Sequence, residues 1–485
     1  MDFIGGQWAD PAGAEGAIDD RSPADLSLQL GRYPYAAAQV DKAVAAARAA
    51  RPAPDCVQLV RDIGAVLKKH EEELARAIAL DVGKPLWEAR TEAQACSAKA
   101  AITADEGMKL VSAFPAPGQA GAECRFRPLG VVAVLGPFNF PVHLPNGHIL
   151  PALACGNAVV FKPSEIAPHA AEIYARCLAE AGVPPGLFNL VQGGPSIGGA
   201  LAAHADIDGV LFTGSWKVGQ AIERACLGQS KLLALEMGGK NAALVLPDAD
   251  FDKAIYDVLF SAFVSAGQRC TAAARAIVVG PAAAERFARR VAQLATRLAI
   301  GHPLDDGVFM GPLASPSALE KFEQGLRATG ADVEELLAPR RLAPRGLAGC
   351  YVSPSVHLVH RRRGTSYERE ELFGPDLAVY PAGSEEEALE IANATDYGLA
   401  ASVHTASSDT FDRCQRALLC GVVNWNAPTV GASGRLPFGG LKHSGNHRPA
   451  ALWSTLYCAA PVAVLRGEPA LDRKKLAPGI FWVDE

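Results

Sequence analysis

Cysteine pairs with metal-binding or redox spacing are missing from this sequence of 485 residues. Its eleven cysteines are scattered, and no two of them are spaced as in a C-x-x-C motif. The count is also odd, so neither a disulfide framework nor a zinc site is expected. Free thiols are stable in a reducing environment, and the cytoplasm is therefore the predicted location.

The chain also lacks a large charge of one sign and a long uninterrupted apolar run. Its formal net charge is −6, whereas proteins that bind nucleic acid concentrate basic residues on one face. The only dense basic run, Arg361–Arg363, is expected to be a solvated loop. The most apolar stretch, residues 129–161, is broken by Gly, Pro, Asn and His. The first residues show no signal-peptide pattern. We expect neither nucleic acid nor membrane as a partner.

Short apolar strands alternate with helices in the first half of the chain. The runs 130–136, 158–161 and 209–213 carry no polar alternation, which is typical of strands buried on both faces. Helices are predicted between them, at about 141–155 and 167–181, and each ends at a glycine. This order predicts a doubly wound parallel sheet.

A second set of strands and helices follows, and the length of the chain alone favours two or three domains. We therefore expect a second α/β domain. Its predicted strands lie near 242–246, 276–279, 377–380 and 399–405, with helices from about 251 and at 384–394. Ahead of the first sheet, helices are predicted at about 36–50 and 57–80, and residues 114–128 read as a linker into an extended segment.

A glycine-bounded turn follows the strand 209–213 directly. The N-terminus of the predicted helix that it opens would present unpaired N–H groups to a pyrophosphate. The glycines allow a sharp turn and a close approach to a ligand. The turn lacks the G-x-G-x-x-G fingerprint, and a purely structural role is equally compatible with it. Its residues are Gly214, Ser215, Trp216, Lys217, Val218 and Gly219.

Lys162 and Glu165 stand at the end of the strand 158–161, on the edge where open α/β sheets bind ligands. A carboxylate at Glu165 would accept hydrogen bonds from ribose hydroxyls and would repel a 2′-phosphate. The pair therefore indicates NAD rather than NADP, although a surface ion pair is the alternative.

Two segments carry groups suited to covalent acyl chemistry. Glu236 lies in Leu-Glu-Met-Gly-Gly, and Cys270 lies in Gly-Gln-Arg-Cys-Thr. The thiol would be the nucleophile and the carboxylate a proton acceptor. The neighbouring guanidinium of Arg269 favours a thiolate. A buried cysteine and a solvated glutamate are the common alternatives.

Two further segments could complete such a site. Asn139, just beyond the strand 130–136, could donate from its amide to an oxyanion, or could simply form a turn. Glu371 stands two residues before Phe373, and the two side chains could hold a ribose and one face of a nicotinamide. A solvated glutamate beside a core phenylalanine is the alternative.

Taken together and in order, these motifs resemble the aldehyde dehydrogenase superfamily, from about residue 3 to residue 460. The resemblance implies that Cys270 attacks the aldehyde, that Asn139 stabilises the oxyanion and that Glu236 activates water to hydrolyse a thioester. It also implies NAD contacts at Lys162, Glu165, the turn 214–219, Glu371 and Phe373. The motifs are Gly-Pro-Phe-Asn-Phe-Pro, Lys-Pro-Ser-Glu, Phe-Thr-Gly-Ser, Leu-Glu-Met-Gly-Gly-Lys-Asn, Gly-Gln-Arg-Cys-Thr, Glu-Glu-Leu-Phe-Gly-Pro and Pro-Phe-Gly-Gly.

The family fold implies two doubly wound α/β domains and a small β arm for oligomerisation, in a homodimer or homotetramer. By this resemblance the NAD-binding domain comprises residues 1–113 and 130–237, and the catalytic domain residues 238–454. Residues 114–129 and 455–485 would form the arm and the C-terminal tail.

A narrower resemblance is to family members that oxidise a carboxylated semialdehyde in arginine catabolism. It rests on His143-Leu-Pro-Asn-Gly-His148, residues 261–271, Asn424-Trp-Asn426 and residues 444–449. Arg269 and Arg448 are candidate anchors for the substrate carboxylates, with structural ion pairs as the equal alternative.

Three other functions stay open. The first is a semialdehyde dehydrogenase of broader specificity. The second is a CoA-acylating enzyme, which would not need the hydrolytic base Glu236. The third is a non-catalytic member of the family.

Overall fold

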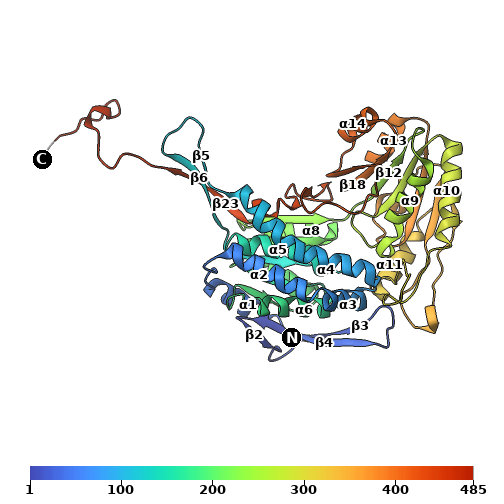
Figure 1. Ribbon diagram of the computed structural model, residues 1–485, viewed down its shortest axis with the longest axis horizontal. Helices are drawn as coiled ribbons and strands as arrows, with labels where there is room; N and C mark the ends of the chain where they lie inside the picture. Colours follow the sequence, from blue (N-terminus) through green and yellow to red (C-terminus); the bar gives the residue numbers. More distant parts are fainter. Residues whose placement is uncertain (484–485) are drawn as a thin grey trace.

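Two seven-stranded sheets organise the chain, one in each half of the sequence (Figure 1). The computed structural model describes residues 1–483, so the last two residues of the predicted segment 455–485 lie outside the described part. Five strands of the first sheet are parallel, in the order β11-β10-β7-β8-β9, and β1 and β2 extend it in antiparallel pairing. The strands are β1 (Asp2–Ile4), β2 (Gln7–Ala9), β7 (Val131–Leu135), β8 (Ala158–Lys162), β9 (Phe188–Leu190), β10 (Gly209–Gly214) and β11 (Leu232–Met237).

The strand order of the first sheet reverses between β7 and β10. The chain runs outward from β7 to β8 and β9, then returns to add β10 and β11 on the other side of β7. Ligands of open α/β sheets bind at such a reversal, beyond the carboxyl ends of the strands. The predicted strands 130–136, 158–161 and 209–213 are confirmed as β7, β8 and β10.

The second sheet has the order β14-β15-β16-β13-β12-β18-β19, with only β14 antiparallel to its neighbour. Together the two sheets confirm the predicted α/β class. The strands are β12 (Asn241–Val245), β13 (Ala273–Val279), β14 (Val333–Leu337), β15 (Ser355–Val359), β16 (Asp376–Ala382), β18 (Ala400–His404) and β19 (Val422–Trp425). The helices of this half are α9 (Phe251–Phe263), α10 (Pro281–Ala295), α11 (Pro316–Leu326), α12 (Ser366–Arg369), α13 (Glu385–Asn393) and α14 (Ser408–Ala417).

One predicted helix is wrong in its extent. The stretch 57–80 forms two helices, because the backbone of His70 leaves the helical region at φ −104° and ψ 17°. At the break, the His70 ring hydrogen-bonds to Glu73 at 3.0 Å and to Glu180, 110 residues away, at 2.9 Å. The helices of the first half are α1 (Ala38–Ala49), α2 (Cys56–Lys69), α3 (Glu71–Val82), α4 (Leu86–Ala101), α5 (His143–Ala154), α6 (Pro168–Glu180), α7 (Pro195–Ala203) and α8 (Trp216–Cys226).

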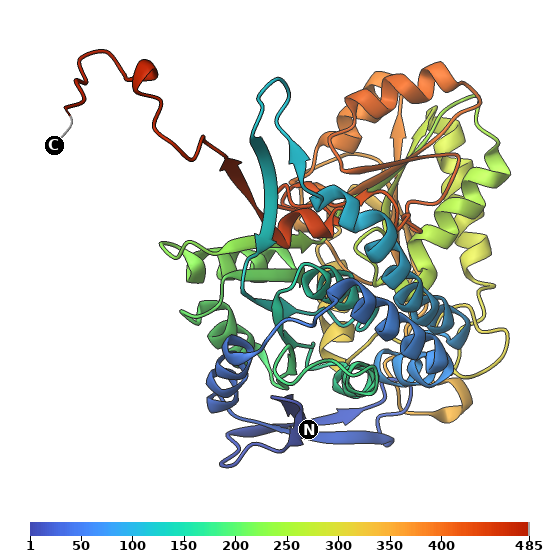
Figure 2. The same ribbon diagram turned by 60° about the vertical axis from the view of Figure 1, so that its left-hand side comes forward.

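A small three-stranded sheet projects from the body (Figures 1 and 2). It joins β5 (Phe114–Pro115), β6 (Ala122–Pro128) and β23 (Ala459–Leu465), with β6 and β23 paired antiparallel from Ala122↔Leu465 to Pro128↔Ala459. The segments 114–129 and 455–485, expected to form the arm and tail, each contribute strands to this sheet, and the second segment opens with the short helix α15 (Ser454–Tyr457). Short ribbons elsewhere pair β3 (Gly16–Arg21) with β4 (Gln29–Tyr35), β17 (Tyr397–Gly398) with β21 (Leu441–Lys442) and β20 (Pro437–Phe438) with β22 (Ala450–Ala451).

Three further observations bear on the expectations from composition. All eleven cysteines are free. Arg361–Arg363 lies on an exposed loop, as predicted. Within residues 1–483 no helix combines the length and the apolar character needed to cross a membrane.

Candidate active site

The candidate site lies where the carboxyl edge of the first sheet meets the amino edge of the second. Asn139 follows β7, and Glu236 is the last residue but one of β11. Cys270 precedes β13, and Glu371 precedes β16. The chain passes from one edge to the other in the three residues between β11 and β12, so the site combines side chains from both halves of the sequence.

The loop before Cys270 has an unusual backbone. Ser265, Ala266 and Gly267 adopt left-handed φ angles of 56°, 52° and 69°. At Gly267 a Cβ would lie 2.1 Å from the carbonyl oxygen of Gly374, so only glycine fits. Left-handed conformations of non-glycine residues cost free energy and persist where surrounding contacts impose them. The loop is therefore held in a shape that the local sequence alone does not favour.

Asn241 anchors the backbone on the other side of the thiol. Its Nδ2 donates to the carbonyl oxygens of Cys270 at 2.7 Å and Ala272 at 2.9 Å, and its Oδ1 accepts from the N–H of Ala400. Asn241 is a functional candidate that the sequence analysis missed. The only sequence signal was its place in the Gly-Gly-Lys-Asn run beside Glu236.

Cys270 is half-buried. Burial, together with the carboxylates of Glu371 and Glu236, raises the pKa of the Cys270 thiol to about 12. Arg269 lowers the pKa, as its position beside the thiol suggested, but its effect is outweighed.

Asn139 lies beside the nucleophile loop. Its side chain is only 7% exposed, and its Nδ2 donates to the carbonyl oxygen of Gln268 at 2.9 Å. An amide nitrogen carries two hydrogens, so one remains for a second acceptor. The predicted oxyanion donor is thus hydrogen-bonded to the backbone of Gln268, which lies two residues before Cys270 in the chain.

Glu236 is buried, and its Oε2 has no hydrogen-bond partner among the described residues. Burial raises the pKa of Glu236 well above the usual range for a carboxyl. Such a carboxyl accepts a proton readily. A Cβ on Gly439 would lie 2.7 Å from Glu236 Oε1 and 2.9 Å from the Cα of Pro449, so the segment around Pro449 packs close to this carboxyl.

Glu371 and Phe373 join the site from the loop before β16. Glu371 accepts a hydrogen bond from the N–H of Gly239 at 2.9 Å, and burial raises its pKa to about 7. Phe373 has a left-handed φ of 53°, and its ring meets Phe138 edge to face at 5.7 Å between centroids. Phe138 comes from the Asn139 segment, so this contact again spans the two sheets.

The predicted cofactor residues lie together at the carboxyl edge of the first sheet. Ser215 caps α8 by accepting a hydrogen bond from the N–H of Val218, and Trp216 stacks on His443 at 3.9 Å between centroids. Lys162 is buried, which lowers its pKa, and its Nζ lies 3.3 Å from Oε2 of the half-exposed Glu165. The exposed Lys217 and the glycines Gly214 and Gly219 complete the turn.

The two candidate substrate anchors differ in their surroundings. Arg269 donates to Glu88 Oε1 at 2.7 Å and to Ser265 Oγ at 2.8 Å. Arg269 therefore forms a structural ion pair, which was the alternative to anchoring a substrate carboxylate. Arg448 is exposed, and within residues 1–483 its guanidinium donates only to the carbonyl of the adjacent His447, at 3.3 Å. It precedes Pro449, which packs near Glu236.

The geometry thus combines a thiol, an amide donor and a buried carboxyl beside a ligand-binding sheet edge. Those groups suit attack on a carbonyl, stabilisation of an oxyanion and proton transfer from water. No cluster of histidine, cysteine and acidic side chains that could hold a metal ion occurs in the described residues.

The aldehyde dehydrogenase family model matches residues 8–460, and the chain belongs to the aldehyde dehydrogenase family. It is 43% identical to an N-succinylglutamate 5-semialdehyde dehydrogenase of Chromobacterium violaceum, over 99% of both chains. Among solved structures, betaine aldehyde dehydrogenase of Staphylococcus aureus in complex with NAD⁺ is similar, with a TM-score of 0.91 and 27% identity over 98% of this chain and 96% of that one. A mutant of aldehyde dehydrogenase C from Pseudomonas syringae, in complex with NAD⁺ and octanal, has a TM-score of 0.90 and 31% identity over 97% of each chain.

Proposed function

We propose that this enzyme oxidises N-succinylglutamate 5-semialdehyde to N-succinylglutamate in arginine catabolism, with NAD as the hydride acceptor. The chain is an aldehyde dehydrogenase by family. The substrate is supported by relatives of that name from Chromobacterium violaceum and Paraburkholderia xenovorans, 43% and 41% identical over 99% of this chain. The observation that carries the chemistry is the meeting of Cys270, Asn139 and Glu236 between the two sheets.

In the first half-reaction the Cys270 thiol loses its proton to solvent, and its sulfur bonds to the aldehyde carbon. The carbonyl oxygen becomes an oxyanion, which the free Nδ2 hydrogen of Asn139 and the N–H of Cys270 would stabilise. Bound NAD would supply the acceptor for the hydride, so that the thiohemiacetal would become a thioester on Cys270.

In the second half-reaction Glu236 takes a proton from water, and the oxygen of that water attacks the thioester carbon. The carbon–sulfur bond breaks, and the proton held by Glu236 passes to the departing Cys270 sulfur, which regenerates the thiol. The acid product then ionises to the carboxylate. Glu236 suits this role because its carboxyl is buried and one carboxyl oxygen has no hydrogen-bond partner among the described residues. A CoA-acylating enzyme would not need such a base.

The residues at the carboxyl edge of the first sheet fit a dinucleotide. The N-terminus of α8 offers backbone donors for a pyrophosphate. Lys162 and Glu165 would meet the adenosine ribose, and Glu371 with Phe373 the nicotinamide ribose. The carboxylate of Glu165 would repel a 2′-phosphate and so favours NAD. The NAD complexes among the solved relatives are consistent with this assignment.

We also propose the domain division 1–113 with 130–237 for NAD binding, 238–454 for catalysis and 114–129 with 455–485 for the arm and tail. The projecting three-stranded sheet, with β23 at an open edge, suits pairing between copies in a homodimer or homotetramer. Light scattering of the intact protein tests this, since a monomeric mass would contradict it.

Eleven free thiols support a location in the reducing cytoplasm.

The deciding experiment measures NADH production with N-succinylglutamate 5-semialdehyde and with shorter, neutral and non-acylated aldehydes. We expect the first to have a kcat/KM at least about 100-fold higher than the others, since unpaired buried polar groups penalise analogues that lack the carboxylates. Similar values across the panel would instead indicate the broader-specificity enzyme. Product analysis with and without CoA distinguishes hydrolysis from acyl transfer to CoA.

Cys270→Ala should abolish NADH production with every aldehyde, whereas Cys124→Ala, which removes a half-buried thiol of the arm, should retain it. Activity that survives in Cys270→Ala would overturn the proposed chemistry.

A further inference from the structure

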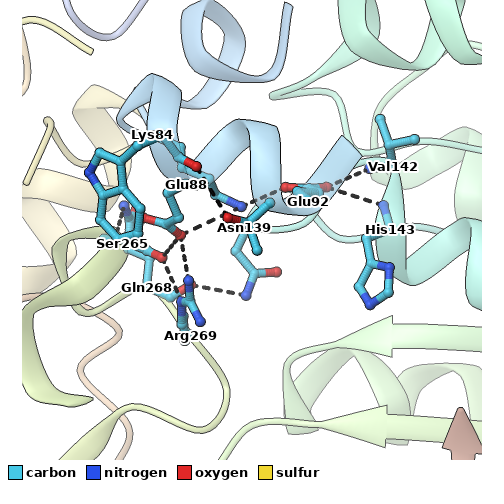
Figure 3. Close-up of polar contacts among 11 residues, drawn as sticks. Lys84, Glu88, Glu92, Asn139, Val142, His143, Ser265, Gln268 and Arg269 are labelled. Carbon is cyan, nitrogen blue, oxygen red and sulfur yellow. Dashed lines mark hydrogen bonds and ion pairs between the residues drawn. The ribbon is translucent and has the colours of Figure 1, made fainter. Parts of the chain in front are cut away.

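Behind the nucleophile loop lies a cluster of buried charges, which we call the Glu88 network: Lys84, Glu88, Glu92, Ser265 and Arg269 (Figure 3). The side chains of Lys84 and Glu88 are each 2% exposed and that of Glu92 is fully buried. Two cations and two carboxylates balance in charge. Lys84, Glu88 and Glu92 are spaced four residues apart in the sequence, but nothing local connects these three residues to Cys270.

Glu88, at the start of α4, holds the nucleophile loop directly. Its Oε1 accepts from Arg269 Nη2 at 2.7 Å and from the hydroxyl of Ser265. Arg269 Nε also donates to Ser265 Oγ at 2.8 Å. Glu88 therefore holds the nucleophile loop at Ser265, where the left-handed stretch begins, and at Arg269, next to Cys270, from a helix more than 170 residues earlier in the chain.

The same network holds the segment that carries Asn139. Glu92 Oε1 accepts from the N–H groups of Val142 and His143, both at 3.1 Å, and its Oε2 pairs with Lys84 Nζ at 2.6 Å. The ring of Phe140, next to Asn139, lies 3.6 Å from Lys84 Nζ and 5.1 Å from the Arg269 guanidinium. One balanced cluster thus contacts the oxyanion-donor segment and the nucleophile loop.

We propose that Glu88 is a positioning residue, which acts through Arg269 and Ser265 to set the nucleophile loop against Asn139. This inference rests on the proposed function, in which Cys270 and Asn139 act on the same carbonyl. A buried ion pair adds little net stability compared with apolar packing, because both charges lose their hydration. Its fixed geometry is what the reaction needs, since a displacement of about 1 Å at the reacting atoms costs about 100-fold in rate.

Glu88→Gln in the full-length enzyme is the direct test, because glutamine keeps the shape and an acceptor oxygen while removing the charge. We expect kcat to fall by about 10- to 100-fold with KM for the aldehyde within about twofold of the wild type. The variant leaves the Arg269 cation unbalanced, while the other charges that face Cys270, the carboxylates of Glu371 and Glu236, are unchanged. Alkylation of Cys270 by iodoacetamide at pH 8 should therefore become up to about tenfold faster.

The double variant Glu88→Gln with Arg269→Gln separates this role from simple destabilisation. Removing the unbalanced cation should return the alkylation rate to the wild-type value or below it. The value of kcat should stay low, because the ion pair that holds the nucleophile loop is still missing. Glu72→Gln is the matched control. Glu72 lies on the neighbouring helix α3, and its carboxylate forms an exposed ion pair with Arg90 of α4. This variant should change neither readout.

The proposal is overturned if Glu88→Gln keeps kcat within twofold, or if its loss of kcat is accompanied by a lower Tm and an unchanged alkylation rate. If the variant does not fold, Ser265→Ala decides, because it removes only the hydroxyl between Glu88 and Arg269. It should lower kcat several-fold, and an unchanged kcat would contradict the proposal. Alkylation needs no substrate, and NADH production by Cys270→Ala tests the proposed function separately.

Discussion

Asn139 donates its Nδ2 to the carbonyl oxygen of Gln268 at 2.9 Å, across the junction of the two sheets. The donor follows β7 of the first sheet, and the acceptor lies two residues before Cys270 in the second. The predicted oxyanion donor is therefore hydrogen-bonded to the loop that carries the predicted nucleophile.

Glu236→Gln should separate the two half-reactions. Thioester formation does not need this base, so we expect a burst of about one NADH per active subunit. Steady-state turnover should then be about 100-fold slower or more, because water is no longer activated. Rapid-mixing absorbance at the NADH band measures both phases. Glu285→Gln, on the exposed face of α10, should behave like the wild type. A lost burst would place Glu236 in the first half-reaction instead.

Cys270 should be slow to react in the enzyme without cofactor. Because burial raises the pKa of Cys270 to about 12, only a small fraction is thiolate near neutral pH. The rate of alkylation by iodoacetamide should rise about tenfold per pH unit between pH 6 and 10, with no plateau. A plateau near pH 7 would show that Arg269 dominates the thiol after all. Cys270→Ala supplies the background rate of the other cysteines.

Glu371 should make stability depend on pH. Its pKa is raised to about 7 in the folded protein by burial, against about 4.3 in an unfolded chain. The neutral form is thus favoured by folding, and this contribution to stability is complete below about pH 4.3 and is lost as the pH rises through about 7. The Tm of Glu371→Gln relative to the wild type should therefore increase from pH 5 to pH 8. A constant difference in Tm would contradict the assigned pKa.

Glu165→Gln should relax the choice of cofactor. Removing the negative charge removes the repulsion of a 2′-phosphate and leaves the Lys162 ammonium, 3.3 Å away, unpaired. The ratio of kcat/KM for NADP to that for NAD should rise by about tenfold or more. Glu180→Gln, at the far end of α6, is the control. Comparable use of both cofactors by the wild type would defeat the repulsion argument.

Arg448→Ala should raise KM for a carboxylated aldehyde much more than for a neutral one. Arg448 is the candidate anchor whose guanidinium has no carboxylate partner among the described residues, and a charged hydrogen bond to a carboxylate contributes about 1.5–3 kcal/mol. A rise of about tenfold or more in KM is expected for N-succinylglutamate 5-semialdehyde. Arg413→Ala, which breaks an exposed pair with Glu385, is the matched control. Equal losses on both aldehydes would exclude anchoring by Arg448.

The fold class was predictable because buried parallel strands leave a strong local pattern. The runs 131–135, 158–161 and 209–212 are apolar throughout, and the structure buries all of their residues within the sheet. The single helix predicted at 57–80 was wrong because the helix breaks at His70, whose ring contacts Glu180, 110 residues away and outside any local pattern.

The candidate site likewise has features that the sequence predicts and features that it does not. The thiol of Cys270, the amide of Asn139 and the carboxyl of Glu236 could be identified from the motifs and their order. Their environment could not. Burial raises the pKa of both Cys270 and Glu236, and the partner of Arg269 is Glu88, 181 residues earlier in the chain. Desolvation and ion pairing depend on which distant segments pack together, and for that reason they appear only once the chain is folded.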